Sequence, residues 1–354
     1  LRRDFTINTL AISLNSKKYG ELVDTFGGLN DLEQKIIITP LEPNKTFSDD
    51  PLRMLRAVRF ASQLNFNIDQ NTKDSIIENS HRLKILSPER IADEINKILM
   101  CENPSIGFKN LEKMKLLQDI IPELIDLKGV EEVEGQTHKD NFYHTLEVVD
   151  NISKNTSNIW LRWAALLHDV GKAPTKKFDK KIGWTFHGHE YIGSKMVKKI
   201  FERLNLPLNE TLKYVQKIVM MSSRPIVISE DIVTDSAVRR LIYDAGNSID
   251  DLLTLCEADI TTKNIKKSVK YQNNFKVVRN KIRDVEERDS IRNFQPPITG
   301  EVIMKHFNIK PCKEIGIIKE KIKNAILDGE ILNDYDEALD LMIKIGKSIG
   351  LEDE

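Results

Sequence analysis

The spacing of hydrophobic positions predicts helices along most of this chain. Between residues 90 and 100, apolar side chains recur every three or four positions and share one helix face, namely Ile91, Ile95, Ile98 and Leu99. Longer stretches of helical character occur at residues 144–152, 159–168 and 189–204. We therefore expect a mainly α-helical, multi-domain protein.

Two helix starts are marked by polar residues followed by proline. Ser48-Asp49-Asp50 precedes Pro51, and Ser87 precedes Pro88. A capping residue followed by proline at the first helical position is typical of helix N-termini. The first forty residues differ, because they contain two short runs typical of strands, 20–24 and 35–39, with Gly27-Gly28 between them. A small α/β segment is therefore expected before the helices.

These patterns divide the chain into four expected domains. The α/β segment covers residues 1–40, and helix signals dominate residues 41–128. A looser stretch near residue 129 indicates a boundary before the helices of 129–262. The last segment, 263–354, opens on a basic run with eight Lys or Arg and no acidic residue up to position 283.

Composition excludes several classes of protein. The 53 Lys and Arg are balanced by 54 Asp and Glu, which argues against a histone-like polycation or a basic membrane-coating helix. With 40% hydrophobic and 30% charged residues, the chain can bury sizeable cores, and no uncharged apolar run approaches the ~18 residues of a membrane span. The three cysteines form no Cys-x-x-Cys pair. We expect a reduced, cytoplasmic protein without membrane contact, and the sequence indicates no oligomeric state.

Arginines recur every three residues in the predicted helix after Pro51. At 100° per residue, Arg53, Arg56 and Arg59 fall within about 120° of the helix circumference, where like charges repel and an anion would neutralise them. Asp50 and Arg53 offer an acceptor and a donor that could meet the edge of a nucleobase. The alternative is that Asp50 only caps the helix and that the arginines form a solvated stripe, some of them paired with Glu89 or Glu94.

Three motifs in order resemble the bacterial CCA-adding tRNA nucleotidyltransferases and their poly(A) polymerase relatives. They are Arg2-Arg3-Asp4-Phe5-Thr6-Ile7-Asn8, Phe47-Ser48-Asp49-Asp50-Pro51-Leu52-Arg53-Met54-Leu55-Arg56-Ala57-Val58-Arg59-Phe60 and Ser87-Pro88-Glu89-Arg90. The resemblance implies addition of C, C and A to tRNA 3′ ends from CTP and ATP, with residues 1–40 as the end of the catalytic head and 41–128 as a helical neck. Poly(A) polymerase is the alternative, because it shares these motifs.

The same resemblance implies roles for individual residues. Arg3, Asp4 and Asn8 would serve the phosphates and ribose of the nucleotide, whereas Asp50 and Arg53 would act as a protein template for the base. Positions that bind the nucleotide in the family correspond to Arg56 and Arg59, and Glu89-Arg90 would support the neck. The chain has Asp49-Asp50 where many relatives have Glu-Asp, but it keeps the template pair.

The catalytic carboxylates of this family are expected upstream of Leu1. Nucleotidyl transfer needs two acidic residues that hold Mg²⁺, and the family carries them, with a Gly-rich phosphate loop, before the Arg-Arg-Asp motif. Since the chain opens on Leu1 rather than on Met, we expect it to be the later part of a longer protein. The 354 residues alone are then expected to bind parts of the substrate without catalysing transfer.

A second constellation predicts a metal site. His168-Asp169 ends an apolar helix, and a buried Asp beside His is costly without a partner such as a divalent ion. His144 and Asp259 are further candidate ligands, and this nitrogen and oxygen set suits Mn²⁺, Fe²⁺, Co²⁺ or Ni²⁺. The motif His168-Asp169-Val170-Gly171-Lys172 resembles the all-α HD superfamily of metal-dependent phosphohydrolases.

The HD resemblance implies hydrolysis of 2′,3′-cyclic phosphates or phosphomonoesters, which is a second candidate function. His187, His189 and Lys172 are the expected additional metal or phosphate contacts. Serines at 222 and 223 stand where two-metal members would offer another His, which argues against a complete dinuclear site. A degraded, purely structural HD unit is the alternative.

The basic run provides a candidate path for an RNA backbone. We expect Lys263, Lys266, Lys267 and Lys270 to contact tRNA, with Tyr271 and Phe275 among them. An exposed, solvated helix explains the same pattern. For the whole chain, a third hypothesis is a fragment that binds RNA and nucleotides without any enzymatic activity.

Overall fold

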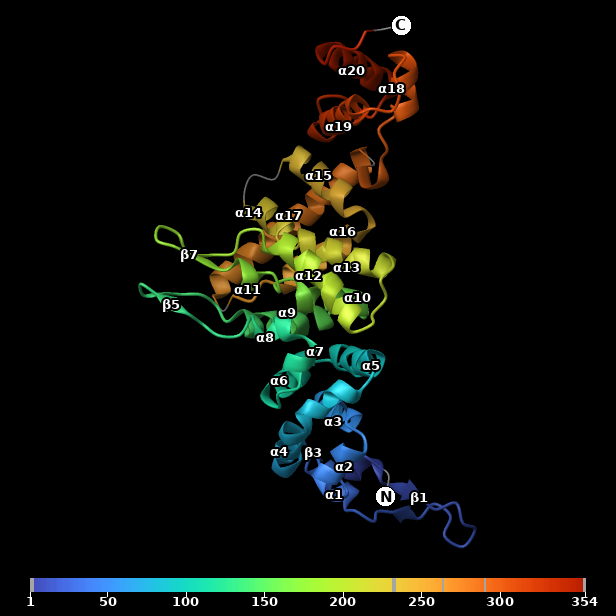
Figure 1. Ribbon diagram of the computed structural model, residues 1–354, viewed down its shortest axis with the longest axis vertical. Helices are drawn as coiled ribbons and strands as arrows, with labels where there is room; N and C mark the ends of the chain where they lie inside the picture. The colour runs from blue at the N-terminus through green and yellow to red at the C-terminus, as the bar shows by residue number, and fades with distance from the viewer. Residues whose placement is uncertain (1–2, 231–233, 263, 290, 353–354) are drawn as a thin grey trace. The chain divides into compact units, whose positions relative to one another are not determined.

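A computed structural model describes residues 3–352 apart from 231–233, 263 and 290. The described chain is helical over most of its length and has only short two-stranded sheets, which confirms the predicted mainly α fold (Figure 1). It forms two compact units. The first comprises Leu1–Ser222 with Thr254–Thr261, and the second Ser223–Leu253 with Thr262–Glu354.

The N-terminal part of the first unit contains the predicted strand runs as two-residue strands. β1 (Ala11–Ile12) pairs with β2 (Leu22–Val23) in an antiparallel hairpin, after the short helix η1 (Thr6–Asn8). After α1 (Gly28–Glu33), β3 (Ile36–Ile37) pairs in parallel with β4 (Asn67–Ile68), a strand that the hydrophobic pattern did not predict. The β3–β4 pair holds the start of the helical neck against the α/β segment.

Neck helices follow in close succession. Their bounds are α2 (Pro43–Asp49), α3 (Leu52–Leu64), α4 (Gln70–Asn79), η2 (Ser80–Ile85), α5 (Pro88–Leu99), α6 (Pro104–Lys113), α7 (Leu117–Ile120) and α8 (Pro122–Ile125). The predicted start at Ser87-Pro88 is confirmed, with proline in the first turn of α5. The predicted start at Pro51 is confirmed to within one residue, since α3 begins at Leu52 and Asp50 Oδ1 accepts from its backbone N–H, although Ser48 and Asp49 themselves end α2. Glu42 caps α2 by accepting from two backbone N–H groups, which fixes the start of that helix.

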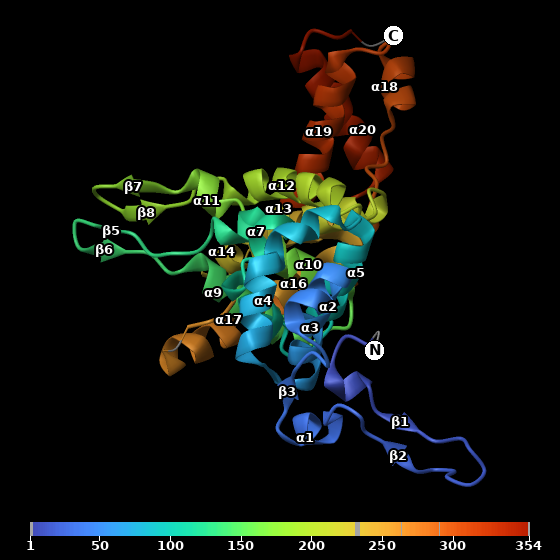
Figure 2. The same cartoon turned by 60° about the horizontal axis from the view of Figure 1, so that its bottom comes forward.

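The later part of the first unit consists of five helices and two hairpins. The helices are α9 (Asn141–Ser153), α10 (Ile159–Leu167), α11 (Lys172–Thr175), α12 (His189–Arg203) and α13 (Glu210–Met221), and they include all three long stretches predicted from the sequence. The looser stretch near residue 129 contains the hairpin β5 (Glu132–Val133) and β6 (Gln136–Thr137). A second hairpin, β7 (Lys177–Asp179) and β8 (Gly183–Thr185), lies beside it, as Figure 2 shows.

One buried arginine joins the neck to these helices. Arg162 lies in the apolar helix α10 with 6% of its surface exposed. Its Nη1 donates to the carbonyls of Leu99 (2.9 Å) and Cys101 (3.0 Å) at the end of α5. Its Nε and Nη2 donate to the carbonyls of Thr156 (3.0 and 2.8 Å) and Ser153 (2.9 Å). A single side chain therefore satisfies four carbonyls from two segments.

The second unit is also helical. It contains α14 (Arg224–Glu230), α15 (Asp235–Ala245), η3 (Gly246–Ser248), α17 (Ile265–Asp289), η4 (Ile291–Asn293), α18 (Gly300–His306), α19 (Lys313–Asp328) and α20 (Tyr335–Ser348), and α16 (Ile249–Ala258) is divided between the units at Leu253. The buried face of α17 carries Phe275, Val278, Ile282 and Val285. Residues 223–253, which the sequence pattern places with 129–262, cluster with the C-terminal segment instead.

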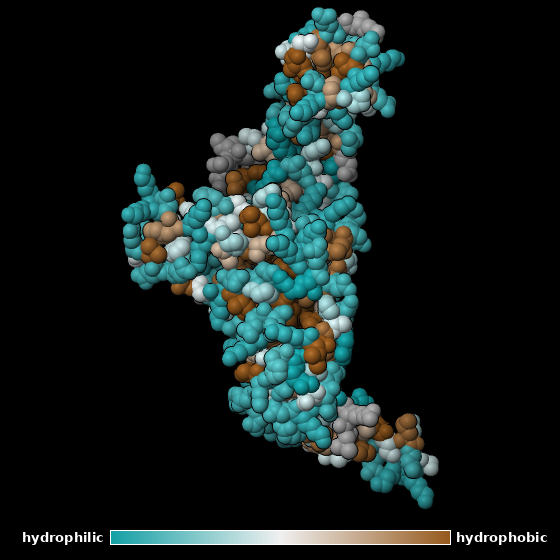
Figure 3. All heavy atoms as spheres, viewed as in Figure 1, coloured by the Kyte–Doolittle hydropathy of each residue, from teal (hydrophilic) through white to brown (hydrophobic). Residues whose placement is uncertain are grey.

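Hydrophilic residues cover most of the face seen in Figure 3, and the hydrophobic residues on it form small separate groups. Within the described ranges, no helix has both the length and the apolarity needed to cross a bilayer.

Candidate metal centre and nucleotide-binding side chains

The His-Asp motif lies at the buried end of α10. Residues Leu161 to Leu167 are all buried, so the helix delivers His168 and Asp169 into the interior, where each is only 2% exposed. His168 Nδ1 donates to the carbonyl of Ala165 at 2.8 Å, which leaves its Nε2 directed at the cluster. Asp169 Oδ2 lies 3.4 Å from this imidazole nitrogen.

Gly171 of the same motif allows α12 to approach. A Cβ atom at this position would lie 2.0 Å from the carbonyl oxygen of His189, so no larger residue fits without a shift of the backbone. This close approach brings His189 toward the motif, and its Nε2 lies 3.7 Å from Asp169 Oδ1. His189 Nδ1 in turn donates to the carbonyl of Phe186 at 2.9 Å.

Four predicted ligands come together around this point. The ligand atoms of His144, His168 and Asp169 all lie within 4.8 Å of one another. Asp259, which follows α16, places its Oδ1 2.8 Å from His144 Nε2 and 3.7 Å from His168 Nε2. Thr261 Oγ1 lies 2.9 Å from His144 Nδ1 and orients that ring. Residues more than a hundred positions apart therefore build one cluster.

The donor set fits a divalent transition metal. His168 Nε2 is buried and lacks a hydrogen-bond partner within the described part of the chain, and Asp259 Oδ1, also buried, faces the imidazole nitrogens of His144 and His168. Leaving a buried polar atom unpaired costs about 1–3 kcal/mol, and buried orphan atoms are uncommon in folded proteins. A cation held by imidazole nitrogen and carboxylate oxygen would satisfy both atoms. His144, His168, Asp169 and Asp259 are the residues that would hold it.

Electrostatics in the cluster favours the charged forms. Burial alone would lower the pKa of His168, but the carboxylates of Asp169 and Asp259 outweigh it and raise that pKa to about 9. Burial would raise the pKa values of both carboxyl groups, yet neighbouring imidazoles lower them, and Lys172 adds to the effect at Asp169. Both carboxylates are therefore ionised in the cluster, and His168 must release its proton before its Nε2 can hold a cation.

The expected additional contacts divide into two groups. Lys172 Nζ donates to Asp169 Oδ2 at 2.7 Å, and His189 lies at the edge of the cluster. His187 is exposed, and no contact joins it to the cluster within the ranges that the structure describes. Ser222 occupies the end of α13, where its hydroxyl donates to the carbonyl of Val219.

The Arg-Arg-Asp motif contacts the arginine helix directly. Asp4 is 6% exposed, and its Oδ2 accepts from Arg56 Nε at 2.7 Å across 52 residues of sequence. Its Oδ1 accepts from Asn8 Nδ2 at 2.9 Å. Burial would raise the pKa of Asp4, but these hydrogen bonds and the Arg56 charge lower it. Arg3 is exposed next to this group, and Arg2 lies outside the described residues.

Carboxylates neutralise two of the three arginines in α3. Arg56 pairs with Asp4, and Arg59, which is only 9% exposed, places its Nε 3.4 Å from Glu94 Oε2. The argument that repulsion among the arginines requires an anion is therefore wrong, and the expected pairing with Glu94 is confirmed for Arg59. Because Glu94 lies on α5, a separate helix, the sequence pattern offered this pairing only as an alternative.

The template pair lies between α2 and α3. Asp50 Oδ1 accepts from the backbone N–H of Leu52 at 3.1 Å, and both carboxylate oxygens lie 3.3 Å from Arg90 Nη2. Arg53 Nη1 donates to the carbonyl of Thr46 at 3.3 Å. Asp50 thus caps the helix, as the alternative held, and it also keeps a half-exposed carboxylate that Arg90 orients.

The basic run lies on α17. Lys263 lies outside the described residues, whereas Lys266, Lys267 and Lys270 are exposed, and no ion pair joins these three to an acidic residue in the described structure. Phe275 is 1% exposed, so the expectation that it lines an RNA path is wrong: it belongs to the core of the second unit. Tyr271 is half-buried.

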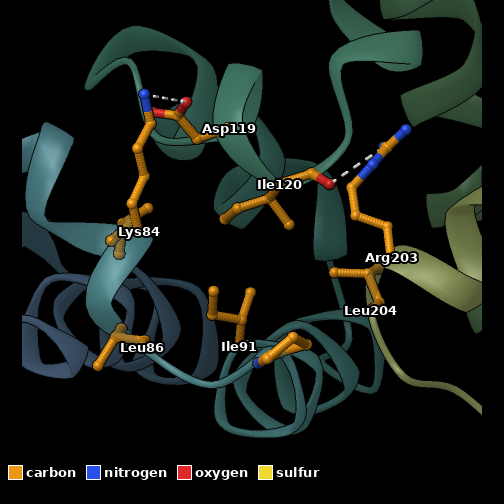
Figure 4. Close-up of a pocket in the computed structure, with 9 residues that line it drawn as sticks. Lys84, Leu86, Ile91, Asp119, Ile120, Arg203 and Leu204 are labelled. Atoms are coloured by element: carbon orange, nitrogen blue, oxygen red, sulfur yellow. Dashed lines mark hydrogen bonds and ion pairs between the residues drawn. The ribbon is translucent and has the colours of Figure 1, made fainter.

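One surface pocket lies away from all of these residues. It is lined by the apolar side chains of Leu86, Ile91 and Leu204, between Lys84 and Asp119 on one side and Arg203 on the other (Figure 4). Lys84 and Asp119 form an ion pair at 3.6 Å, and Arg203 Nη1 donates to the carbonyl of Ile120 at 3.5 Å. No predicted site residue lines it.

Sequence reasoning missed two features. The first is Arg162, whose only signal was a single charge within an apolar helix. The second is an aromatic group on the hairpins, formed by His138, Trp184 and Phe186. The signal in the sequence was Trp184-Thr185-Phe186-His187, where two aromatic residues lie next to the candidate contacts His187 and His189.

Three protein-family models match the chain. A model described as the poly A polymerase head domain matches residues 1–38. A probable RNA and SrmB-binding site of polymerase A matches residues 65–127, and the HD domain matches residues 141–264.

Curated proteins and solved structures resemble it as well. An A-adding tRNA nucleotidyltransferase of Deinococcus radiodurans is 31% identical over 73% of this chain and 58% of that protein. A multifunctional CCA protein of Shewanella frigidimarina is 37% identical over 58% of this chain and 49% of that protein. The chain thus spans about half the length of the curated relatives it matches.

Among solved structures, a Bacillus stearothermophilus CCA-adding enzyme in complex with CTP has a TM-score of 0.68 and 20% identity over 98% of this chain and 74% of that chain. A Thermotoga maritima CCA-adding enzyme complexed with tRNA has a TM-score of 0.55 and 21% identity, over 98% of this chain and 72% of that chain. At such identity these two structures are similar in fold.

Proposed function

Because the chain belongs to the family of CCA-adding tRNA nucleotidyltransferases and poly(A) polymerases that carry an HD domain, we propose that the whole protein adds C, C and A to tRNA 3′ ends from CTP and ATP. The observation that supports this most directly is the contact between Asp4 and Arg56, which joins the Arg-Arg-Asp motif to the template helix α3. Relatives of similar fold are described as complexes with CTP, with ATP and with tRNA.

Different side chains of the proposed site contact the base, the ribose and the phosphates of the nucleotide. Asp50 and Arg53 select the base by hydrogen bonds to its edge, since a carboxylate accepts and a guanidinium donates. Asp4 and Asn8 hold the ribose, and Arg3 and Arg56 supply charge for the phosphates. We assign Arg59 a supporting role, because its guanidinium is buried against Glu94 and thereby fixes α3 on α5.

Base selection is tested by extension of a tRNA that lacks its CCA end. With the whole protein, we expect C incorporation from CTP and a three-nucleotide extension when ATP is also present. Asp50→Ala is expected to lose discrimination between CTP and ATP while it keeps triphosphate affinity, because the phosphates bind elsewhere. The measurement is gel analysis of the products with each nucleotide alone and with both.

Asp49→Ala is the matched control, since Asp49 is an exposed neighbour at the end of α2. Extension by A without C would instead identify an A-adding enzyme like the Deinococcus relative. A long A tail would identify a poly(A) polymerase, and either product would contradict CCA addition.

The His-Asp cluster supports a second activity, hydrolysis of 2′,3′-cyclic phosphates or phosphomonoesters. The supporting observation is the buried His168 Nε2, which lacks a hydrogen-bond partner among the described residues and lies beside the carboxylates of Asp169 and Asp259. A divalent ion bound there would supply charge that polarises a phosphoryl oxygen and lowers the pKa of water. In a cyclic ester, the water oxygen bonds to phosphorus, the P–O2′ bond breaks, and a proton passes to O2′, which leaves a 3′-phosphate. His189 lies at the edge of the cluster, where it can hold or move that proton.

The basic helix α17 supports tRNA binding. We expect that replacing Lys266, Lys267 and Lys270 together by Gln lowers tRNA affinity and reduces the slope of log affinity against log salt by about 1 for each lysine that contacts a phosphate. Filter binding or anisotropy over a salt titration measures it. The matched control changes the same three residues to Arg, which keeps the charge and is expected to keep the slope. An unchanged slope in the Gln variant would contradict the proposal that these lysines of α17 contact RNA.

A further inference from the structure

The two hairpins of the first unit meet through aromatic side chains. In the register of β7 and β8, Phe178 lies opposite Trp184, and their ring centroids are 5.4 Å apart. His138, which follows β6, contacts Trp184 edge-on at 5.0 Å and Phe186 at 6.1 Å. Trp184 Nε1 donates to the carbonyl of Gln136 at 3.1 Å, which fixes the indole across both hairpins. The group is therefore an ordered surface built from two loops.

This aromatic group is more than the packing that the hairpins need. Two-stranded hairpins are marginal in water, so some apolar contact between them is expected. Yet Trp184, Phe186 and His138 are only half-buried, and two lysines border them. Lys176 Nζ lies 5.7 Å from the Trp184 ring and Lys172 Nζ 5.8 Å from the Phe186 ring. Partly exposed aromatic rings beside cations are typical of surfaces that bind nucleobases and phosphates.

The group is continuous with the His-Asp cluster. Lys172 contacts both, because its Nζ donates to Asp169 Oδ2 at 2.7 Å while it lies over the Phe186 ring. Phe186 is tied to His189 by the hydrogen bond from His189 Nδ1 to its carbonyl. A phosphate at the cluster would thus have aromatic faces on the side where the hairpins project (Figure 2).

We propose that the hairpin pair is the base-binding part of the His-Asp site, with Trp184 and Phe186 stacking on the nucleobase of a ribonucleotide whose phosphate lies against the metal cluster. The substrate class is then a nucleotide with a free 3′-phosphate or 2′,3′-cyclic phosphate, at the end of an RNA or alone. This inference rests on the proposed phosphohydrolase function. It adds that the nucleobase contributes to affinity, so that a phosphoester without a base binds more weakly.

Binding to the metal-loaded chain tests the proposal. The probes are adenosine 3′-monophosphate and inorganic phosphate, and the method is isothermal titration calorimetry. We expect Trp184→Leu to weaken nucleotide binding about tenfold, because leucine keeps apolar bulk but has no π face. Phosphate binding should not change. Trp184→Phe should restore most of the nucleotide affinity, and Tyr191→Leu, at an exposed aromatic residue outside the group, should have no effect.

Two outcomes would overturn the proposal. One is unchanged nucleotide affinity in Trp184→Leu. The other is equal loss of nucleotide and phosphate binding, which would mean that the indole only holds the hairpins in place. The ratio of KM for 2′,3′-cyclic AMP to KM for glycerol 2-phosphate gives a second readout. A base-dependent loss of binding without turnover of either ester would support the base site and refute the phosphohydrolase function alone.

Discussion

Asp169→Asn is expected to abolish divalent-metal binding at the His-Asp cluster. The substitution keeps the size of the side chain but removes the central negative charge. Asp169 Oδ2 lies 3.4 Å from His168 Nε2, and the same carboxylate contacts Lys172 and faces His144. Changing a residue that only orients a metal ligand commonly costs 10–100-fold in affinity, so loss of a ligand should cost about 100-fold or more.

Metal content of the purified protein measures this effect after loading with Ni²⁺, Mn²⁺, Co²⁺ or Fe²⁺. His81→Ala is the control, because His81 is an exposed histidine in the neck. Circular dichroism must accompany the measurement, since Asn leaves His168 and Lys172 without their carboxylate and so destabilises the fold. Wild-type metal content in a folded Asp169→Asn protein would contradict the metal centre.

Arg162→Ala is expected to destabilise the first unit strongly. It would remove the donors to Leu99, Cys101, Ser153 and Thr156 and leave their carbonyls without this partner. Hydrogen bonds to a charged group contribute about 1.5–3 kcal/mol each, but they are not additive. We therefore expect a loss of about 3 kcal/mol or more in the free energy of unfolding.

Chemical denaturation measures this loss, and two variants make it specific. Arg162→Lys should recover only part of the stability, because an ammonium has three donors and lacks the planar fork. Arg283→Ala, at an exposed position of α17, should change stability by less than about 0.5 kcal/mol. A small effect of Arg162→Ala would show that water or local rearrangement satisfies the four carbonyls.

The part of the candidate site that the sequence could predict is local. His168 and Asp169 are adjacent, and Asp50 and Arg53 are one helical turn apart. Such motifs can be recognised from neighbouring residues alone, without knowledge of contacts between distant segments. The pairing of Arg59 with Glu94 and of Arg56 with Asp4 was not predictable in the same way, because each pair joins separate elements. Charge repulsion within one helix was therefore a poor guide to an anion site.

Helix boundaries show the same division. The starts of α3 and α5, next to Pro51 and Pro88, follow from their own residues, whereas α2, which begins at Pro43 after the capping residue Glu42, was not predicted. Phe275 reads as part of a basic surface by its neighbours along the chain. In the fold it lies on the buried, apolar face of α17, together with Val278 and Ile282. These three residues recur at helical spacing, so they share one face of the helix.

By itself, the sequence determined the helical class, the arginine and His-Asp motifs and the family, because periodicity and contiguous motifs are written in neighbouring residues. Only the tertiary structure decided which carboxylate meets which cation, since packing brings α5 against α3 and, at a separate place, α9 and the turn after α16 against the end of α10. It also decided that Asp259 contacts His144, which lies 115 positions earlier in the sequence, and that Arg162 joins two segments. In the same way, it decided that two hairpins place Trp184 and Phe186 beside the metal cluster. Hydrophobic packing sets these distances, and no local pattern encodes them.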